Sequence, residues 1–243
     1  SQTFLALGVG AIVVVCTLAM LLSNPPAGYV PPAPASGAVA KRPAVVAPRD
    51  MDWREMLSTP QFYLMWLMFI LAAAAGLFLI SNAALIADAQ AQWKAGYLLV
   101  MMLAIFNTVG RVVAGYVSDA IGRRNTMLLA FALQAVNMFL FANYTTPTML
   151  MVGAAFAALC YGTIFTLMPA GMADFYGLKN LGMNYGILFT AFGVAGSVGS
   201  LLGGRVRDLT GNYNTAYTAV GVMLLAAVAL AMVLRSPKPA DSR

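Results

Sequence analysis

The residues from Gly115 to Arg124 read Gly-Tyr-Val-Ser-Asp-Ala-Ile-Gly-Arg-Arg, and they end an apolar run that begins near Gly96. Glycine at the first of these positions permits close backbone approach, and Gly122 permits the left-handed conformation that ends a helix. Asp119 can accept hydrogen bonds from neighbouring helix N-termini. Since the next apolar run starts at about Thr126, the stretch is predicted to join two helices with almost no loop.

The chain on both sides of this turn is strongly apolar. Of its 243 residues 61% are hydrophobic and 9% are charged, whereas a soluble domain has roughly 45–50% apolar and 25% charged residues. Several runs of about 20 apolar residues are long enough to span a bilayer. Because these runs are continuous, they exclude the alternating pattern of barrel strands. The predicted fold class is an all-α polytopic membrane protein.

Seven segments are predicted to span the membrane, with polar turns at 118–125, 173–184 and 205–212. A Pro- and Ala-rich stretch, 24–60, is predicted to be a linker whose end forms a short interfacial segment before a helix that starts at Thr59-Pro60. The predicted spans are 3–22, 62–87, 96–117, 126–142, 148–172, 185–204 and 213–234.

The distribution of basic residues predicts the orientation. If the linker is cytoplasmic, ten lysines and arginines lie on the cytoplasmic side and three on the outer side, as the positive-inside rule requires. The C-terminus is then cytoplasmic. The net charge of +6 is explained in this way and does not indicate a nucleic-acid partner.

The chain contains no histidine, which removes His-based catalytic triads and most metal sites. The predicted spans also lack an acidic pair. We therefore expect no metal, no cofactor and no enzymatic activity.

Arg111 lies inside the apolar run, eight residues before Asp119. At about 1.5 Å per residue it lies about 12 Å from the turn, close to the middle of a hydrocarbon core about 30 Å thick. A cation there costs at least about 2.5–3.5 kcal/mol and needs an anionic or polar partner. Asn107, one helical turn away, shares its face. The alternative is an arginine that snorkels to the surface or caps helix carbonyls.

The turn resembles the loop signature of the major facilitator superfamily, Gly-x-x-x-Asp-x-x-Gly-Arg-Arg/Lys, carried here by Gly115, Asp119, Gly122, Arg123 and Arg124. A copy of this signature joins helices eight and nine in that superfamily. The resemblance implies that 96–117 is helix eight and 3–22 is helix six. The chain would then be the C-terminal half of a transporter plus one helix.

The resemblance therefore divides the chain into four parts. Residues 1–23 would be the last helix of the N-terminal bundle, and 24–60 the cytoplasmic interdomain linker. Residues 61–235 would form the C-terminal six-helix bundle, and 236–243 a cytoplasmic tail. Since Ser1 stands directly before an apolar span, we expect the chain to be part of a longer protein that supplies the N-terminal bundle.

Within the superfamily, Asn107-x-x-Gly-Arg111 and Asp174-Phe-Tyr-Gly-x-Lys179-Asn180 look like the oxalate/formate antiporter family and the monocarboxylate transporters. In both groups the helix-eight arginine binds substrate carboxylate, and Arg111 matches it. Monocarboxylate transporters commonly have aspartate where this chain has Asn107. The lysine of the oxalate transporter's helix eleven is replaced by Phe192.

Aromatic residues at helical spacing are further candidates for the substrate site. Tyr161 and Phe165 are four residues apart, and Phe189 and Phe192 are three apart. Such spacing is also typical of simple packing. The resembling families line their cavity with aromatics on these two helices, and a small organic acid has an apolar body that rings can enclose.

The resulting expectation is a secondary transporter of a small monocarboxylate such as lactate, in a bacterial inner membrane. One arginine in an apolar pocket suits a monoanion better than a dianion. We expect proton symport by alternating access, with the proton carried by substrate or by the other half. The alternatives are an oxalate/formate-type antiporter and a carboxylate sensor that does not transport.

Overall fold

The computed structural model describes residues 2–21 and 50–235, and every regular element in these ranges is a helix. Most of the predicted linker, from 24 to 49, and the predicted tail, 236–243, lie outside the described residues. The chain divides into two units, Ser1–Val45 and Val46–Arg243. The first contains α1 (Gln2–Met20), which corresponds to the first predicted span. The all-α fold class is confirmed.

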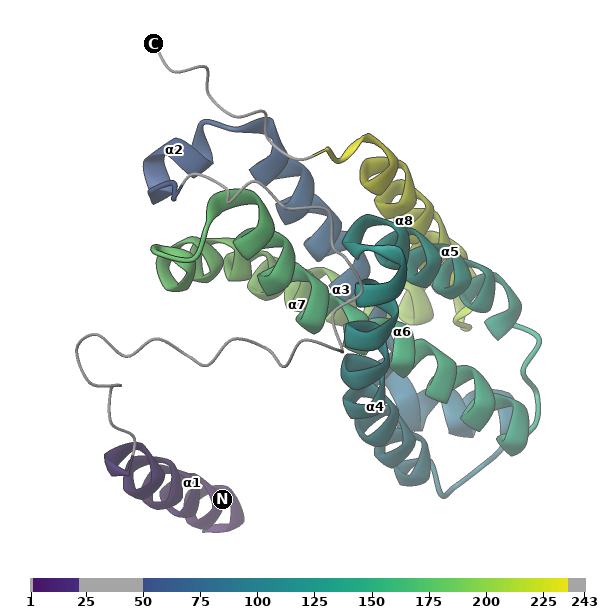
Figure 1. Ribbon diagram of the computed structural model, residues 1–243. Coiled ribbons are helices and arrows are strands. Elements are labelled where there is room, and N and C mark those ends of the chain that lie inside the picture. Colours follow the sequence, from purple (N-terminus) through teal and green to yellow (C-terminus); the bar gives the residue numbers. More distant parts are fainter. Residues whose placement is uncertain (1, 22–49, 236–243) are drawn as a thin grey trace. The chain divides into compact units, whose positions relative to one another are not determined.

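The second unit contains one short helix and six long ones, labelled in Figure 1. Five of the long helices, all except α5, are long and apolar enough to cross a membrane. Helix α5 is more polar because arginines and asparagine fill its first turn. The helices of this unit are α2 (Trp53–Leu57), α3 (Pro60–Ala91), α4 (Tyr97–Ile121), α5 (Arg123–Phe141), α6 (Pro147–Tyr176), α7 (Leu181–Thr210) and α8 (Asn214–Val233).

The turn between α4 and α5 is shorter than predicted. The sequence predicts a turn over 118–125, but only Gly122 separates the two helices. Its φ of +86° lies where L-residues with a side chain are strained. One glycine is enough to change the chain direction, so Asp119 and Arg123 lie in helices.

The other two predicted polar turns are also too long. Helix α6 continues to Tyr176 and α7 starts at Leu181, so that the loop expected over 173–184 shrinks to four residues. Helix α7 continues to Thr210 and includes the charged residues expected in the turn after 204. Gly177 and Gly211, both with positive φ, end these helices. Polar side chains near a helix end reach water without breaking the helix, which is why composition misplaced these boundaries.

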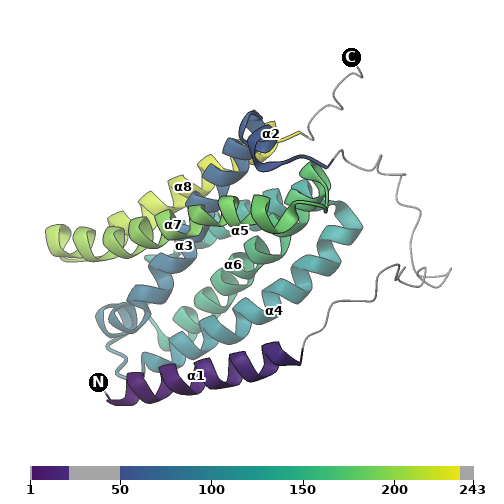
Figure 2. The same cartoon turned by 90° about the vertical axis from the view of Figure 1, so that its left-hand side faces the viewer.

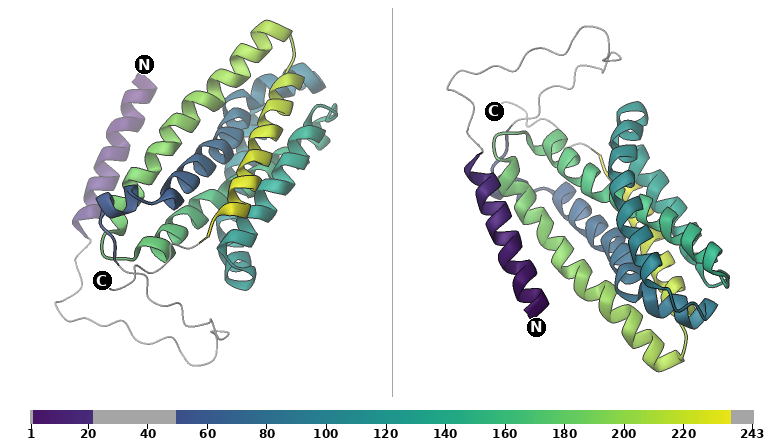
Figure 3. Two further views of the ribbon diagram at one scale, coloured as in Figure 1. Left: turned by 90° about the horizontal axis from the view of Figure 1, so that it is seen from above. Right: turned by 90° about the horizontal axis from the view of Figure 1, so that it is seen from below.

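Helix α3 is central in the second unit. It contacts α7, α8, α6 and α4, whereas α4 packs mainly on α6, and α5 packs on α8 and α6. Figure 2 shows α6 alongside α4, and the left view of Figure 3 shows α3 between α7 and α8. Half of the 32 residues of α3 are buried, among them Phe69 and Phe78.

Helices α4 and α6 approach so closely that glycine is required at their contact. A Cβ atom on Gly162 would overlap the backbone oxygen of Asn107, and one on Gly110 would overlap the backbone oxygen of Leu159. Gly115, by contrast, leaves room for a Cβ, whose nearest neighbour would be a methyl group of Thr166 at 4.0 Å. The close approach predicted for Gly115 therefore lies elsewhere on the same helix.

Helices α3 and α7 form the second close pair. A Cβ on Gly199 would lie 2.5 Å from the backbone oxygen of Ala74, and Gly203 packs against Asn82. These two small residues let the helices approach closely.

The segment before α3 is held against the turn between α6 and α7. Asp50 accepts a hydrogen bond from the backbone N–H of Lys179 at 3.1 Å. The backbone oxygen of Met51 accepts from the side chains of Asn180 and Asn184, each at 3.1 Å. Asp52 then caps α2 through a capping box. The helical end of the linker stretch is thereby fixed in place.

Candidate functional site

Arg111 lies near the middle of α4, fourteen residues after its start at Tyr97 and ten before its end at Ile121. Its Nε donates a hydrogen bond to Oδ1 of Asn107 at 3.3 Å, as the spacing of four predicts. The side chain is exposed. Within residues 2–21 and 50–235, no carboxylate forms an ion pair with it.

The guanidinium of Arg111 is stacked against an aromatic ring. Its carbon lies 4.6 Å from the ring centroid of Phe165 on α6, within the range of a cation–π interaction. The same two helices are joined at this level by Thr166, whose hydroxyl donates to the backbone oxygen of Arg111 at 3.0 Å. Helix α6 therefore fixes the position of Arg111 through side chain and backbone.

The predicted aromatic residues form one cluster around this ring. Phe165 packs edge-on against Tyr161 with centroids 5.2 Å apart, and against Phe192 of α7 at 5.6 Å. Phe192 stacks on Phe189 at 5.2 Å. All six residues predicted for the substrate site, from three different helices, are thus brought together. Whether they bind a substrate stays a prediction.

The sequence did not predict Phe69, whose ring packs against three others of the cluster. This fully buried residue of α3 contacts three of the predicted rings, Phe165, Phe189 and Phe192, at centroid distances of 5.8–6.3 Å. Helix α3 is apolar around its whole circumference, so no periodic pattern distinguishes Phe69 from Phe62 or Phe78. Only the fold reveals it.

Two neighbouring polar residues of α3, Ser81 and Asn82, are separate from this cluster. The hydroxyl of Ser81 donates to the backbone oxygen of Leu77 at 2.6 Å, and the side-chain amide of Asn82 donates to that of Phe78 at 2.9 Å. Both groups therefore bond to their own helix.

The signature turn holds a network of charges at one end of the bundle. Arg123 donates to Ser118 at 2.5 Å, to Asp119 at 3.4 Å and to Asp174 of α6 at 3.2 Å. Arg124 donates through Nε to the backbone oxygen of Ala231 at 2.9 Å and also bonds that of Met232. The two neighbouring arginines thus tie α5 to different helices, one to α4 and α6 and the other to α8.

The chemistry available at the Arg111 cluster is that of anion binding. It combines one cation, the amide of Asn107 and the hydroxyl of Tyr161 with aromatic walls. Among the described residues no group of three acidic, cysteine or histidine side chains could hold a metal ion. A guanidinium can give a carboxylate two parallel hydrogen bonds, and the rings can enclose the apolar part of a small organic acid.

Comparison with known protein families identifies the family of this chain. Residues 80–243 match the model of the Major Facilitator Superfamily. Because this match covers more than half of the chain, the chain belongs to that superfamily. The superfamily predicted from the turn at 115–124 is therefore confirmed, and so is the prediction that the chain is not an enzyme.

Individual relatives support the resemblance to oxalate/formate antiporters and monocarboxylate transporters. The oxalate:formate antiporter of Oxalobacter formigenes is 32% identical over 202 residues, which are 79% of this chain and 46% of that protein. An uncharacterized MFS-type transporter of Escherichia coli is 31% identical over 61% of this chain and 38% of its own length. Monocarboxylate transporter 13 of Rattus norvegicus is 29% identical over 53% of this chain and 30% of its own. The matches span less than half the length of each of these relatives.

Proposed function

We propose that this protein is a secondary active transporter of a small monocarboxylate such as lactate, and that Arg111 binds the carboxylate. The proposal rests on the position of Arg111, its exposure and its lack of a carboxylate partner among the described residues. It lies in the middle of a membrane helix, is exposed, and has no carboxylate partner within the described parts of the chain. Because an unpaired cation in that position is costly, an anionic ligand is its natural counterion.

The surroundings of Arg111 favour a single negative charge. The cluster contains one cation, and Phe192 occupies the position where the oxalate transporter has a lysine. Stacking on Phe165 shields one face of the Arg111 guanidinium from water. The edge of the guanidinium remains available for two parallel hydrogen bonds to a carboxylate. The rings of Phe189 and Phe192 would then contact the apolar end of the acid.

The transport mechanism that suits this arrangement is alternating access. Residues 61–235 would act as one six-helix bundle, and α1 would belong to the other, so that the two bundles rock about a site at the membrane midplane. The stretch 24–60 would connect the bundles on the cytoplasmic side. With its ten basic residues inside, the chain would have a cytoplasmic C-terminus in a bacterial inner membrane.

Proton symport is the coupling that we propose. The carboxylates of the described long helices, Asp88, Asp119, Asp174 and Asp208, lie near helix ends rather than beside Arg111. The proton would therefore travel with the substrate or on a residue of the other bundle.

Antiport is the second candidate, because one relative is named as an oxalate:formate antiporter and matches over four fifths of this chain. In that case a carboxylate inside the vesicle, rather than a pH gradient, would drive uptake. A carboxylate sensor would bind the ligand and show no counterflow.

Uptake of labelled lactate into proteoliposomes tests the proposal. We expect uptake to rise when the inside is alkaline. Uptake that is independent of the pH gradient but requires internal oxalate or formate would indicate antiport instead of symport. Binding without counterflow would indicate a sensor.

The carboxylate role of Arg111 has its own test. Arg111→Ala should abolish lactate binding, and Arg111→Lys should retain a weaker contact, because an ammonium is a point charge without the bidentate geometry. Arg205→Ala, which removes an exposed arginine of α7, is the matched control and should bind normally. Full affinity of the Arg111→Ala variant would refute the role of Arg111.

A further inference from the structure

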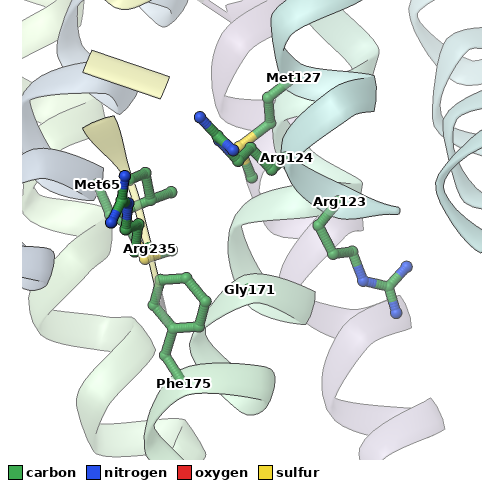
Figure 4. A pocket seen from close by; sticks show the side chains of 8 residues that line it. Met65, Arg123, Arg124, Met127, Gly171, Phe175 and Arg235 are labelled. Atoms are coloured by element: carbon green, nitrogen blue, oxygen red, sulfur yellow. The ribbon is translucent and has the colours of Figure 1, made fainter. Parts of the chain in front are cut away.

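A second cationic site lies at the end of the bundle that carries the signature turn. A cavity of about 330 Å³ opens there between α3, α5, α6 and the end of α8. Figure 4 shows the side chains around it. It is lined by Met65, Arg123, Arg124, Met127, Gly171, Phe175, Leu234 and Arg235.

The three arginines of this cavity are not equivalent. Arg123 turns its guanidinium away, toward Ser118 and two carboxylates, so its charge is compensated. Among the described residues, Arg124 bonds two backbone oxygens at the end of α8, which orient its guanidinium without neutralising it. Arg235 is exposed, and none of the residues that the structure describes forms a hydrogen bond or ion pair with it.

Two positive charges that have no carboxylate partner among the described residues therefore border an otherwise apolar space. The rest of its described wall consists of Met65, Met127, Gly171, Phe175 and Leu234, and none of the described residues that line it is acidic. A soluble inorganic anion would gain nothing from such walls. A ligand with a negatively charged head and an apolar continuation would match both parts, and methionine side chains adapt easily to such shapes.

We propose that this cavity binds the phosphate headgroup of an anionic phospholipid. Arginine binds phosphate oxygens through paired N–H groups, and basic pockets between membrane helices recognise such headgroups. The volume is at the lower end of the range for ligand pockets, enough for a headgroup and its glycerol. The acyl chains would continue over the apolar surface of the helices. This inference does not depend on which substrate the Arg111 site binds.

Native mass spectrometry of the detergent-solubilised protein tests the proposal, with phosphatidylglycerol as the probe. Arg235→Gln should weaken phosphatidylglycerol binding about tenfold, the effect of one lost charge-assisted hydrogen bond. Arg235 is exposed and follows the end of α8, so we expect the variant to unfold at the normal temperature. Lys179→Gln removes an exposed charge elsewhere at the same end of the bundle and should change binding less than twofold.

A variant that keeps both charges distinguishes the cavity from a merely charged surface. A Cβ on Gly171 would lie 3.1 Å from the terminal methyl of Met65 and 3.9 Å from that of Met127, so Gly171→Leu should fill the space between them. It should reduce phosphatidylglycerol binding although every arginine remains. Unchanged binding in this variant would overturn the cavity as the site.

The identity of the ligand is tested by two further probes. Phosphatidylcholine should bind more weakly than phosphatidylglycerol by about tenfold, and equal binding would remove the role of charge. Glycerol phosphate should not compete with phosphatidylglycerol at equal concentration. Effective competition would show that the site takes a free phosphate compound and would overturn the lipid assignment.

Discussion

Replacing Phe192 by lysine should change the charge of the ligand that the Arg111 site prefers. The guanidinium carbon of Arg111 lies 4.6 Å from the centroid of Phe165, which lies 5.6 Å from that of Phe192. An ammonium in the place of the Phe192 ring would therefore lie no more than about 10 Å from Arg111. That spacing is short enough for one dicarboxylate to contact both cations.

The magnitude follows from the interaction of the lysine with the second carboxylate, because repulsion between the lysine and Arg111 is the same whichever ligand is bound and cancels in the ratio. A carboxylate about 4 Å from the ammonium gains about 4 kcal/mol at an effective dielectric constant of about 20. Because Phe192 is only half-buried, solvent screening and the desolvation of the second carboxylate reduce this gain. We expect oxalate to be favoured by about 2 kcal/mol, or roughly thirtyfold.

Calorimetric titration of the solubilised protein with oxalate and with lactate measures this preference. The ratio of the two affinities is compared in the wild type, in Phe192→Lys and in Phe192→Met, which removes the ring without adding charge. We expect the ratio to shift toward oxalate only in the lysine variant. An unchanged ratio, or an equal shift with methionine, would refute the assignment of Phe192 as a determinant of ligand charge.

Further predictions concern the packing and the loops around the site. Gly162→Ala should lower thermal stability, by about 1–3 kcal/mol of overpacking, because its Cβ would overlap α4. Gly193→Ala, where the space is open, should be neutral or stabilising, and equal melting temperatures would contradict the close packing. Burial raises the pKa of Tyr144 in the loop after α5. Its folded pKa exceeds the unfolded one, so its contribution is complete below about pH 10 and is lost as pH rises further. Tyr144→Phe should therefore flatten the fall in melting temperature above that pH, and an unaltered profile would exclude this role. Asp50→Ala should speed hydrogen exchange at the Lys179 amide about tenfold or more, because a charged acceptor is lost. Asp52→Ala, which uncaps α2 only, should leave that amide protected.

Most residues of the candidate site, though not Phe69, were predictable because they form local pairs in the sequence. Arg111 is conspicuous as a charge in an apolar run, and Asn107 shares its helix face at a spacing of four. Tyr161 and Phe165 form the corresponding pair on α6. The meeting of these pairs could not be derived from spacing. It depends on the close contact of α4 with α6, at glycines that look like many others in this chain.

The helix ends were predicted less well, for a different reason. Polar and charged residues suggested loops at 173–184 and 205–212, but the backbone stays helical until a glycine with positive φ. Composition indicates where a chain meets water, whereas glycine conformation decides where a helix stops. Residues such as Asp174 are therefore placed in helices, which is how Asp174 can reach Arg123 from α6.

The two close helix pairs divide the Arg111 site into two parts. Arg111, Asn107 and Phe165 belong to the pair α4–α6, which is fixed by backbone contact at Gly162 and by the Thr166 hydrogen bond. Phe69, Phe189 and Phe192 belong to the pair α3–α7, fixed by contact at Gly199. Between the parts, the contacts among these residues are ring-to-ring packing of Phe165 with Phe69 and Phe192. Such packing has weak directional preference. A shift between the two pairs would therefore break no hydrogen bond within either pair, but it would have to displace Tyr161 of α6, whose ring packs so closely on Gly76 of α3 that a Cβ there would overlap it. In a transporter, that would let the site change its hold on the apolar end of the ligand while the carboxylate stays bound.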